Sequence, residues 1–178
     1  MAFYRDKFCL VPVSKDTKGE LKVLKQKREK CKKPRCVTLK VRYRLGLELS
    51  SHQQCDKIPG LDGTFRANLD MATQTDGQGR GFHEGRFNWT SNAGNVEGRM
   101  RGITNAGTHR RPPLDDCEPC NVRGHMEGQL EGKIVNGRHK GCRVRASYVI
   151  NYDPGVAGQN TGAWGTLEGV VVCPCKSD

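Results

Sequence analysis

Aromatic side chains and long apolar runs are both scarce in this sequence. Phe, Trp and Tyr make up 6% of the 178 residues, and apolar residues as a whole make up 35%. No run approaches the roughly 18 consecutive apolar residues that a membrane-spanning helix requires, so we expect no transmembrane segment. The opening MAFYRDKFCLVPVSKD lacks the apolar core and the small-residue cleavage pattern of a signal peptide. A cytoplasmic location is therefore the default expectation.

Catalytic motifs are absent as well. The chain has no phosphate-cradling glycine loop, no Gly-x-Ser-x-Gly and no His-Glu-x-x-His. Its five histidines are dispersed, and only His83 falls on a predicted inward face, which it shares with Phe87 and Trp89. A lone inward histidine is more typical of a hydrogen-bonded core residue than of a general base. Whether the protein is an enzyme stays open, and a non-catalytic role is favoured.

What the sequence does contain is strict alternation of apolar and polar residues. In VTLKVRYRLGLEL every second side chain from Val37 to Leu49 is apolar. A period of two over thirteen residues indicates a strand with one buried side. Further runs cover 65–71, 82–90, 96–104, 123–135, 142–152 and 163–173. The Asn-Gly within residues 135–138 is typical of a tight hairpin turn.

These runs, with FCLVPV near the start, predict an all-β protein. The expected architecture is an antiparallel meander of about eight strands. Closure into a small β-barrel would remove the two unpaired edges of this sheet. A two-sheet sandwich or a jelly roll is the alternative. We expect one barrel domain over residues 37–178, preceded by a basic N-terminal arm, residues 1–36, that contains a short strand at 8–13.

The positive charge is concentrated in one segment. The formal net charge is +11, and thirteen Lys or Arg residues face three acidic residues between Lys15 and Arg44. Residues 18–30 offer little to bury, so we interpret them as a lysine-rich, poorly packed arm. The candidate binding residues of this basic segment are Lys22, Lys25, Lys27, Arg28, Lys30, Lys32, Lys33 and Arg35.

Glycine recurs on the apolar side of the predicted strands. In GHMEGQLEGKI the parity places Gly124, Gly128 and Gly132 on the same face as Met126 and Leu130. Glycine normally weakens a strand, so its repeated inward placement suggests tight coiling or large side chains packed over bare backbone. The glutamates beside these glycines then face outward, where they can pair with basic residues on neighbouring strands.

Nine cysteines form the most informative constellation. In an up-and-down meander, Cys31 and Cys36 lie at the same end as Cys117 and Cys120, while Cys55, Cys142, Cys173 and Cys175 gather at the opposite end. Each group of four matches a tetrahedral zinc site, so zinc is the candidate cofactor. Disulfides or free thiols explain the same spacing, and disulfides would place the protein on a surface or outside the cell. Cys9 is left without a partner.

Three functions are compatible with these features. The leading hypothesis is a non-catalytic structural or assembly module that contacts itself or an acidic macromolecule through its basic segment and cysteines. The second is binding of nucleic acid or another polyanion without sequence specificity. The third is a small-molecule-binding barrel, such as an isomerase or cyclase, whose cavity would be lined by His83, Trp89, Tyr148 and Tyr152.

Overall fold

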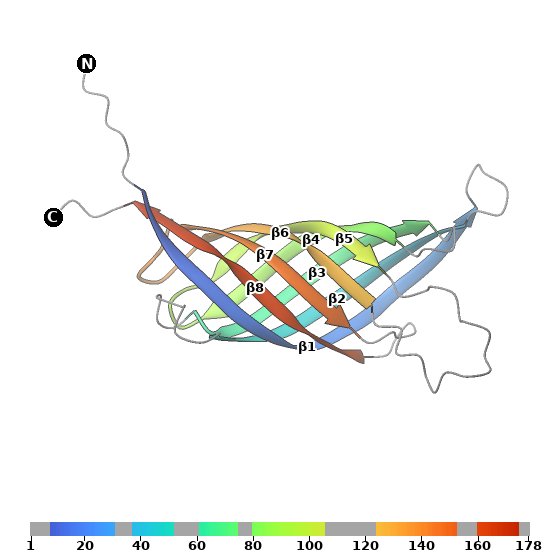
Figure 1. The fold of residues 1–178 in the computed structure, drawn as a ribbon, viewed down its shortest axis with the longest axis horizontal. Helices are drawn as coiled ribbons and strands as arrows, with labels where there is room; N and C mark the ends of the chain where they lie inside the picture. Colours follow the sequence, from blue (N-terminus) through green and yellow to red (C-terminus); the bar gives the residue numbers. More distant parts are fainter. Residues whose placement is uncertain are drawn as a thin grey trace, which may run out of the picture.

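Eight antiparallel strands follow one another in chain order and close into a barrel, with the last paired to the first (Figure 1). The computed structural model describes residues 8–30, 37–51, 61–74, 80–105, 124–152 and 160–174. The strands are β1 (Phe8–Lys30), β2 (Val37–Ser51), β3 (Gly63–Gln74), β4 (Arg80–Ser91), β5 (Val96–Asn105), β6 (Gly124–Ile134), β7 (Arg143–Tyr152) and β8 (Asn160–Pro174). The expected antiparallel barrel is confirmed, and the sandwich and jelly-roll alternatives are not adopted. None of the described residues forms a helix long and apolar enough to cross a membrane.

The alternation in β2 determines which face of that strand is buried. Tyr43, Leu45 and Leu47 are at most 2% exposed, whereas Arg42 and Arg44 point to solvent. Strand geometry turns successive side chains to opposite sides, so an alternating sequence separates an apolar inner face from a charged outer face. β7 repeats the same sequence of exposed and buried positions.

The basic segment is not a poorly packed arm, and this expectation was wrong. Residues 18–30 are the second half of β1, and the barrel begins at Phe8 rather than at residue 37. Leu21 and Val23 are 3% and 9% exposed and belong to the core. The high lysine content concealed the alternation of Thr17, Leu21 and Val23 on one face, because outward positions of a strand accept charged residues at little cost.

β1 is long because its two halves pair with different neighbours. Phe8–Lys22 pairs with β8, and Lys15–Lys30 pairs with β2. The shared stretch closes the barrel along its length (Figure 1). A register shift between Val23 and Lys25 follows this stretch. Such a bulge exchanges the two faces, and it leaves Lys25 and Lys27 exposed on the outside.

The connection between β6 and β7 is longer than the tight turn that the sequence predicted. β6 ends at Ile134 and β7 begins at Arg143. Gly137 and Gly141 have φ angles of 76° and 94°, which glycine adopts more readily than other residues. The loop is closed by two hydrogen bonds of 2.8 Å, from Ile134 N to Cys142 O and from Gly141 N to Ile134 O.

The described part of the interior is filled by side chains. Trp89, Tyr43, Tyr148 and Phe65 are each at most 2% exposed. A hollow beside Thr17 and Tyr148 measures about 10 Å³, which is the space of a single water molecule. The third hypothesis, a ligand-binding barrel, therefore receives no support from the described interior.

The inward glycines let adjacent strands approach closely. A Cβ built on Gly98 would lie 2.0 Å from the carbonyl oxygen of Glu131, and one on Gly128 would lie 2.1 Å from that of Arg101 and 2.7 Å from the Tyr148 hydroxyl. Neither position can accept a side chain without moving the neighbouring strand. The packing of a large side chain over bare backbone, one of the two suggested causes, is confirmed at Gly128 by Tyr148.

Candidate functional site

His83 lies in a buried hydrogen-bonded chain, as the sequence favoured. Its Nδ1 is hydrogen-bonded to Thr104 Oγ1 and its Nε2 to the hydroxyl of Tyr148. Burial lowers the pKa of His83 to about 4, so the ring is neutral at pH 7. Burial likewise raises the pKa of Tyr148. The two groups satisfy each other, so this chain rigidifies the core, and His83 also borders an open concavity that it shares with Phe82 and Ile103.

The other two suggested cavity residues do not join His83 in one pocket. Trp89 is six residues farther along β4, about 20 Å away at the rise of a strand, and its Nε1 donates a hydrogen bond of 3.0 Å to Leu61 O. Tyr152 is buried with its ring against Gly124. The structure thus brings together His83 and Tyr148 and leaves Trp89 apart.

The basic residues of β1 lie on the outer face of the barrel. Lys22, Lys25 and Lys27 are exposed, and Glu29 accepts ion pairs of 3.0 Å from Lys27 and 2.8 Å from Lys40. Hydrogen bonds from these two lysines lower the pKa of Glu29. Arg28 and Lys30 also belong to β1. Lys32, Lys33 and Arg35 lie outside the described residues.

A cluster of four exposed arginines continues this basic surface. We call Arg44, Arg66, Arg86 and Arg99 the arginine patch; they come from β2, β3, β4 and β5 in turn. With Asn68 and Asn88 they line a concavity of about 890 Å³ on the outer face. The register places Arg44 opposite Asn68, Asn68 opposite Arg86, and Arg86 opposite Arg99.

The arginine patch has few acidic neighbours. Glu97 is the acidic residue that lines the same concavity, and it lies opposite Lys133 in the ladder. Glu131 lies opposite Arg99, but its carboxylate is 3.7 Å from Arg145 Nε.

No ion pair within the described part of the chain involves any of the four arginines. Like charges directly opposite each other destabilise a sheet, so the Arg86–Arg99 pair costs stability unless an anion joins it.

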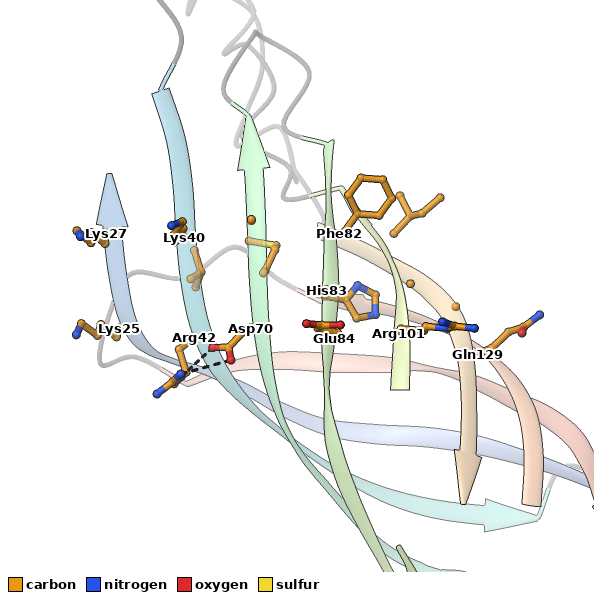
Figure 2. A pocket seen from close by; sticks show the side chains of 16 residues that line it. Lys25, Lys27, Lys40, Arg42, Asp70, Phe82, His83, Glu84, Arg101 and Gln129 are labelled. Carbon is orange, nitrogen blue, oxygen red and sulfur yellow. Dashed lines mark hydrogen bonds and ion pairs between the residues drawn. The ribbon is translucent and has the colours of Figure 1, made fainter. Parts of the chain in front are cut away.

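The concavity extends along the outer face into a second region with a different character. A hollow of about 460 Å³ beside Glu84 and Arg101 reaches from the arginine patch to a concavity of about 800 Å³. Phe82 and Ile103 lie opposite each other there and are 75% and 51% exposed. Figure 2 shows Phe82 on the same outer face as the lysines of β1 and β2. We call the continuous surface the furrow, with an arginine end and an apolar end.

The cations around the apolar end are partly neutralised. Arg42 Nε donates a hydrogen bond of 2.8 Å to Asp70, and this bond raises the pKa of Arg42 (Figure 2). Lys27 and Lys40 share Glu29. Lys25 and Arg101 line the same concavity. The furrow can therefore take up an anionic polymer at its arginine end and a flat or apolar group at its other end.

The cysteines confirm part of the expected grouping. Cys142 and Cys173, which the meander placed at one end, form a disulfide bond with a Cα–Cα distance of 4.6 Å. Cys9, expected to have no partner, is disulfide-bonded, so that expectation was wrong. β1 starts beside the end of β8, where Cys9 stands opposite Cys173 in the register, although Cys173 itself is bonded to Cys142. Cys31, Cys36, Cys55, Cys117, Cys120 and Cys175 lie outside the described residues.

No family model, no curated protein and no solved structure matches this chain.

Sequence reasoning missed the arginine patch. The arginines stand near acidic residues in the chain, as in HEGRF and VEGRM, so the sequence outside residues 15–44 looks nearly neutral. The usable signal was parity, because the four arginines all fall on outward positions of their strands. Only the strand register brings Arg86 opposite Arg99.

Proposed function

We propose that the protein is a non-catalytic binding module that holds an acidic polymer along the furrow. The observation that carries this proposal is the arginine patch, which presents four exposed cations on four adjacent strands, none of them ion-paired with an acidic residue in the part of the chain that the structure describes. The filled interior and the neutral, hydrogen-bonded His83 support a binding role over a catalytic one. Under this proposal the acidic partner expected from the sequence binds along the furrow.

The spacing of the patch suits repeated anionic groups. Neighbouring strands are about 4.8 Å apart, so the row from Lys22 through Arg44 to Arg99 spans about 19 Å. Arginine presents a planar fork of donors that binds phosphate, sulfate or carboxylate oxygens in pairs. A polymer that crosses the strands along this row would meet several such forks at once, and its binding would weaken steeply with added salt.

The apolar end of the furrow distinguishes between types of acidic polymer. An exposed aromatic ring beside cations can stack a nucleobase, whereas a sulfated polysaccharide or a polyglutamate chain has no flat group to place there. Replacement of Phe82 by Ala should therefore weaken binding of single-stranded nucleic acid and leave the other two polymers unaffected.

A direct test compares two double variants with equal loss of charge. Arg86→Gln/Arg99→Gln removes the centre of the patch, and Arg138→Gln/Lys140→Gln removes two exposed cations from the loop between β6 and β7. Fluorescence anisotropy at low salt would measure binding of labelled oligo-dT, heparin and polyglutamate. The patch variant should lose about ten- to hundredfold in affinity, and the control should lose much less. Equal losses, or no binding of any polymer by the wild type, would refute the proposal.

The disulfide bonds bear on location. Disulfides persist in oxidising compartments and are rare in a reducing cytosol. The Cys142–Cys173 bond therefore supports a surface or extracellular location over the cytoplasmic default. A free-thiol count on protein purified from its native source would test this, and full reactivity of Cys142 and Cys173 would contradict it.

Self-association is a second candidate function, favoured by a separate apolar strip. Phe8 and Leu10 are 59% and 64% exposed on the outer face of β1, opposite Pro174 and Val172 of β8. A second copy could cover this strip. An intermolecular bond through Cys9 loses support, since Cys9 is disulfide-bonded within the single chain.

Light scattering over a range of concentrations tests this candidate. The wild type should form dimers or larger assemblies that Leu10→Glu disrupts, while Val149→Glu, at an exposed apolar position of β7, leaves them intact. A wild type that stays monomeric throughout would rule out self-association.

A further inference from the structure

Three metal-ligating side chains meet at the end of β7 and β8. The imidazole of His139 and the sulfur atoms of Cys142 and Cys173 lie within 4.8 Å of one another. Cys142 is 6% exposed, while His139 and Cys173 are partly exposed. The meander predicts that the two cysteines lie together, whereas the sequence gives no sign that His139 joins them.

The loop between β6 and β7 holds two of these ligands in a defined turn. Cys142 N donates a hydrogen bond of 3.1 Å to His139 O, with two residues between them. Gly141, at φ 94°, precedes Cys142 and permits the turn. Pairs of ligands separated by two residues are a common spacing in structural zinc sites.

The third ligand is held by the barrel and does not depend on the disulfide. β7 and β8 pair continuously from Arg143 to Tyr152, and Arg143 is the partner of Val172. The next residues outward, Cys142 and Cys173, therefore stay side by side when the bond between their sulfur atoms is broken. The barrel thus preserves the site in the reduced protein.

We propose that the reduced protein binds one zinc ion through His139, Cys142 and Cys173, so that this corner alternates between a disulfide and a metal site. A dithiol reductant supplies two electrons and two protons, the bond between the two sulfur atoms breaks, and the dithiol itself becomes a disulfide. Zinc then displaces the two thiol protons and binds the neutral imidazole, and water fills the fourth position.

The required movement is small. Zinc lies about 2.3 Å from a cysteine sulfur and about 2.0 Å from a histidine nitrogen, which sets tetrahedral ligand atoms about 3.5 to 3.8 Å apart. The largest separation, up to 4.8 Å, has to shrink by about 1 Å. The two sulfur atoms, which are bonded to each other in the disulfide, have to move apart by about 1.7 Å once that bond is broken, which side-chain rotation can supply. Both forms tie the β6–β7 loop to β8, so zinc replaces the cross-link that reduction removes.

Alkylation followed by mass spectrometry tests the site residue by residue, so other cysteines do not confuse the result. The full-length protein is reduced with a phosphine, which is converted to phosphine oxide, and is then alkylated with and without added zinc. Zinc should slow modification of Cys142 and Cys173 about tenfold or more in the wild type. The His139→Ala variant should lose most of this protection, and His125→Ala, which changes a partly exposed histidine of β6, should keep it.

Two further measurements make the outcome decisive. Reduced wild type should bind one more equivalent of Co²⁺ than reduced His139→Ala, with the absorption of a thiolate-ligated tetrahedral ion. The oxidised protein, whose Cys142 and Cys173 sulfur atoms are bonded to each other, should bind none at this site. Equal protection in wild type and His139→Ala, or no protection of Cys142 by zinc, would overturn the proposal.

Discussion

Two cationic regions of the barrel differ in whether their positive charges are buried and paired or exposed and unpaired within the described residues. At the seam between β1 and β2, the side chain of Lys15 is 1% exposed and its Nζ donates hydrogen bonds of 2.7 Å to Asp62 and 3.3 Å to Ser51. In the arginine patch, Arg86 and Arg99 are exposed, stand directly opposite each other and have no acidic partner among the described residues. A buried cation has lost its water and requires a hydrogen-bonding or ionic partner, whereas an exposed cation is solvated and requires none. The exposed cations are therefore the ones left for a ligand.

The largest effect on stability is expected when Asp62, the acidic partner of the buried Lys15, is removed. Asp62→Ala leaves Lys15 buried with fewer hydrogen bonds, and it should lower the free energy of unfolding by about 1–3 kcal/mol. Chemical denaturation at pH 7 measures this loss, with Asp70→Ala as the control because its partner Arg42 is exposed. An Asp62→Ala variant as stable as the control would show that burial of Lys15 needs no acid.

In the arginine patch, a substitution that weakens binding should make the fold more stable. Arg86→Glu places a carboxylate opposite Arg99, so binding of the acidic polymer should fall about tenfold or more while the free energy of unfolding rises by about 0.2–1 kcal/mol. Anisotropy and thermal melts on the same samples measure the two changes. A loss of stability together with the loss of binding would mean that Arg86 holds the sheet together.

A substitution at the apolar end of the furrow should increase the affinity for the polymer. Asp70→Asn removes one negative charge and frees the Arg42 guanidinium, which is now hydrogen-bonded to Asp70. Polymer affinity at low salt should rise about threefold, and the gain should disappear at high salt. In an Arg42→Gln background the same substitution changes the net charge by the same amount but frees no guanidinium. It should then give a much smaller increase over Arg42→Gln alone, which separates the freed guanidinium from the change in net charge.

The smallest expected effect concerns pH. Hydrogen bonds from Lys40 and Lys27 lower the pKa of Glu29, so its contribution to stability is present above the unfolded pKa of about 4.3 and is lost as the pH falls through the folded value. Glu29→Gln should therefore be slightly less stable than the wild type at pH 7 and equally stable at acid pH. Melting curves at both pH values test this, and a difference that persists in acid would exclude Glu29 as its source.

Much of the fold could be predicted from the sequence because it depends on local alternation. The strand at Val37–Ser51 and the meander follow from a period of two, and strand order alone placed Cys142 near Cys173. The segment 18–30 was misjudged because lysine content outweighed a weaker alternation that closure of the barrel completes. The partner of Cys9 was missed for the same reason, since both errors concern where β1 starts and ends.

Alternation by itself determined that this protein is built of antiparallel strands with apolar residues and glycines on one face and charges on the other, because the zigzag of a strand assigns every residue to a face. The tertiary structure decided that the strands close into a barrel and which charges on the outer face are neighbours. Arg44, Arg66, Arg86 and Arg99 are far apart in the chain and become one patch only through the register of four strands. Register is set by the packing of the inner face against its neighbours, so the candidate binding surface is a consequence of the core beneath it.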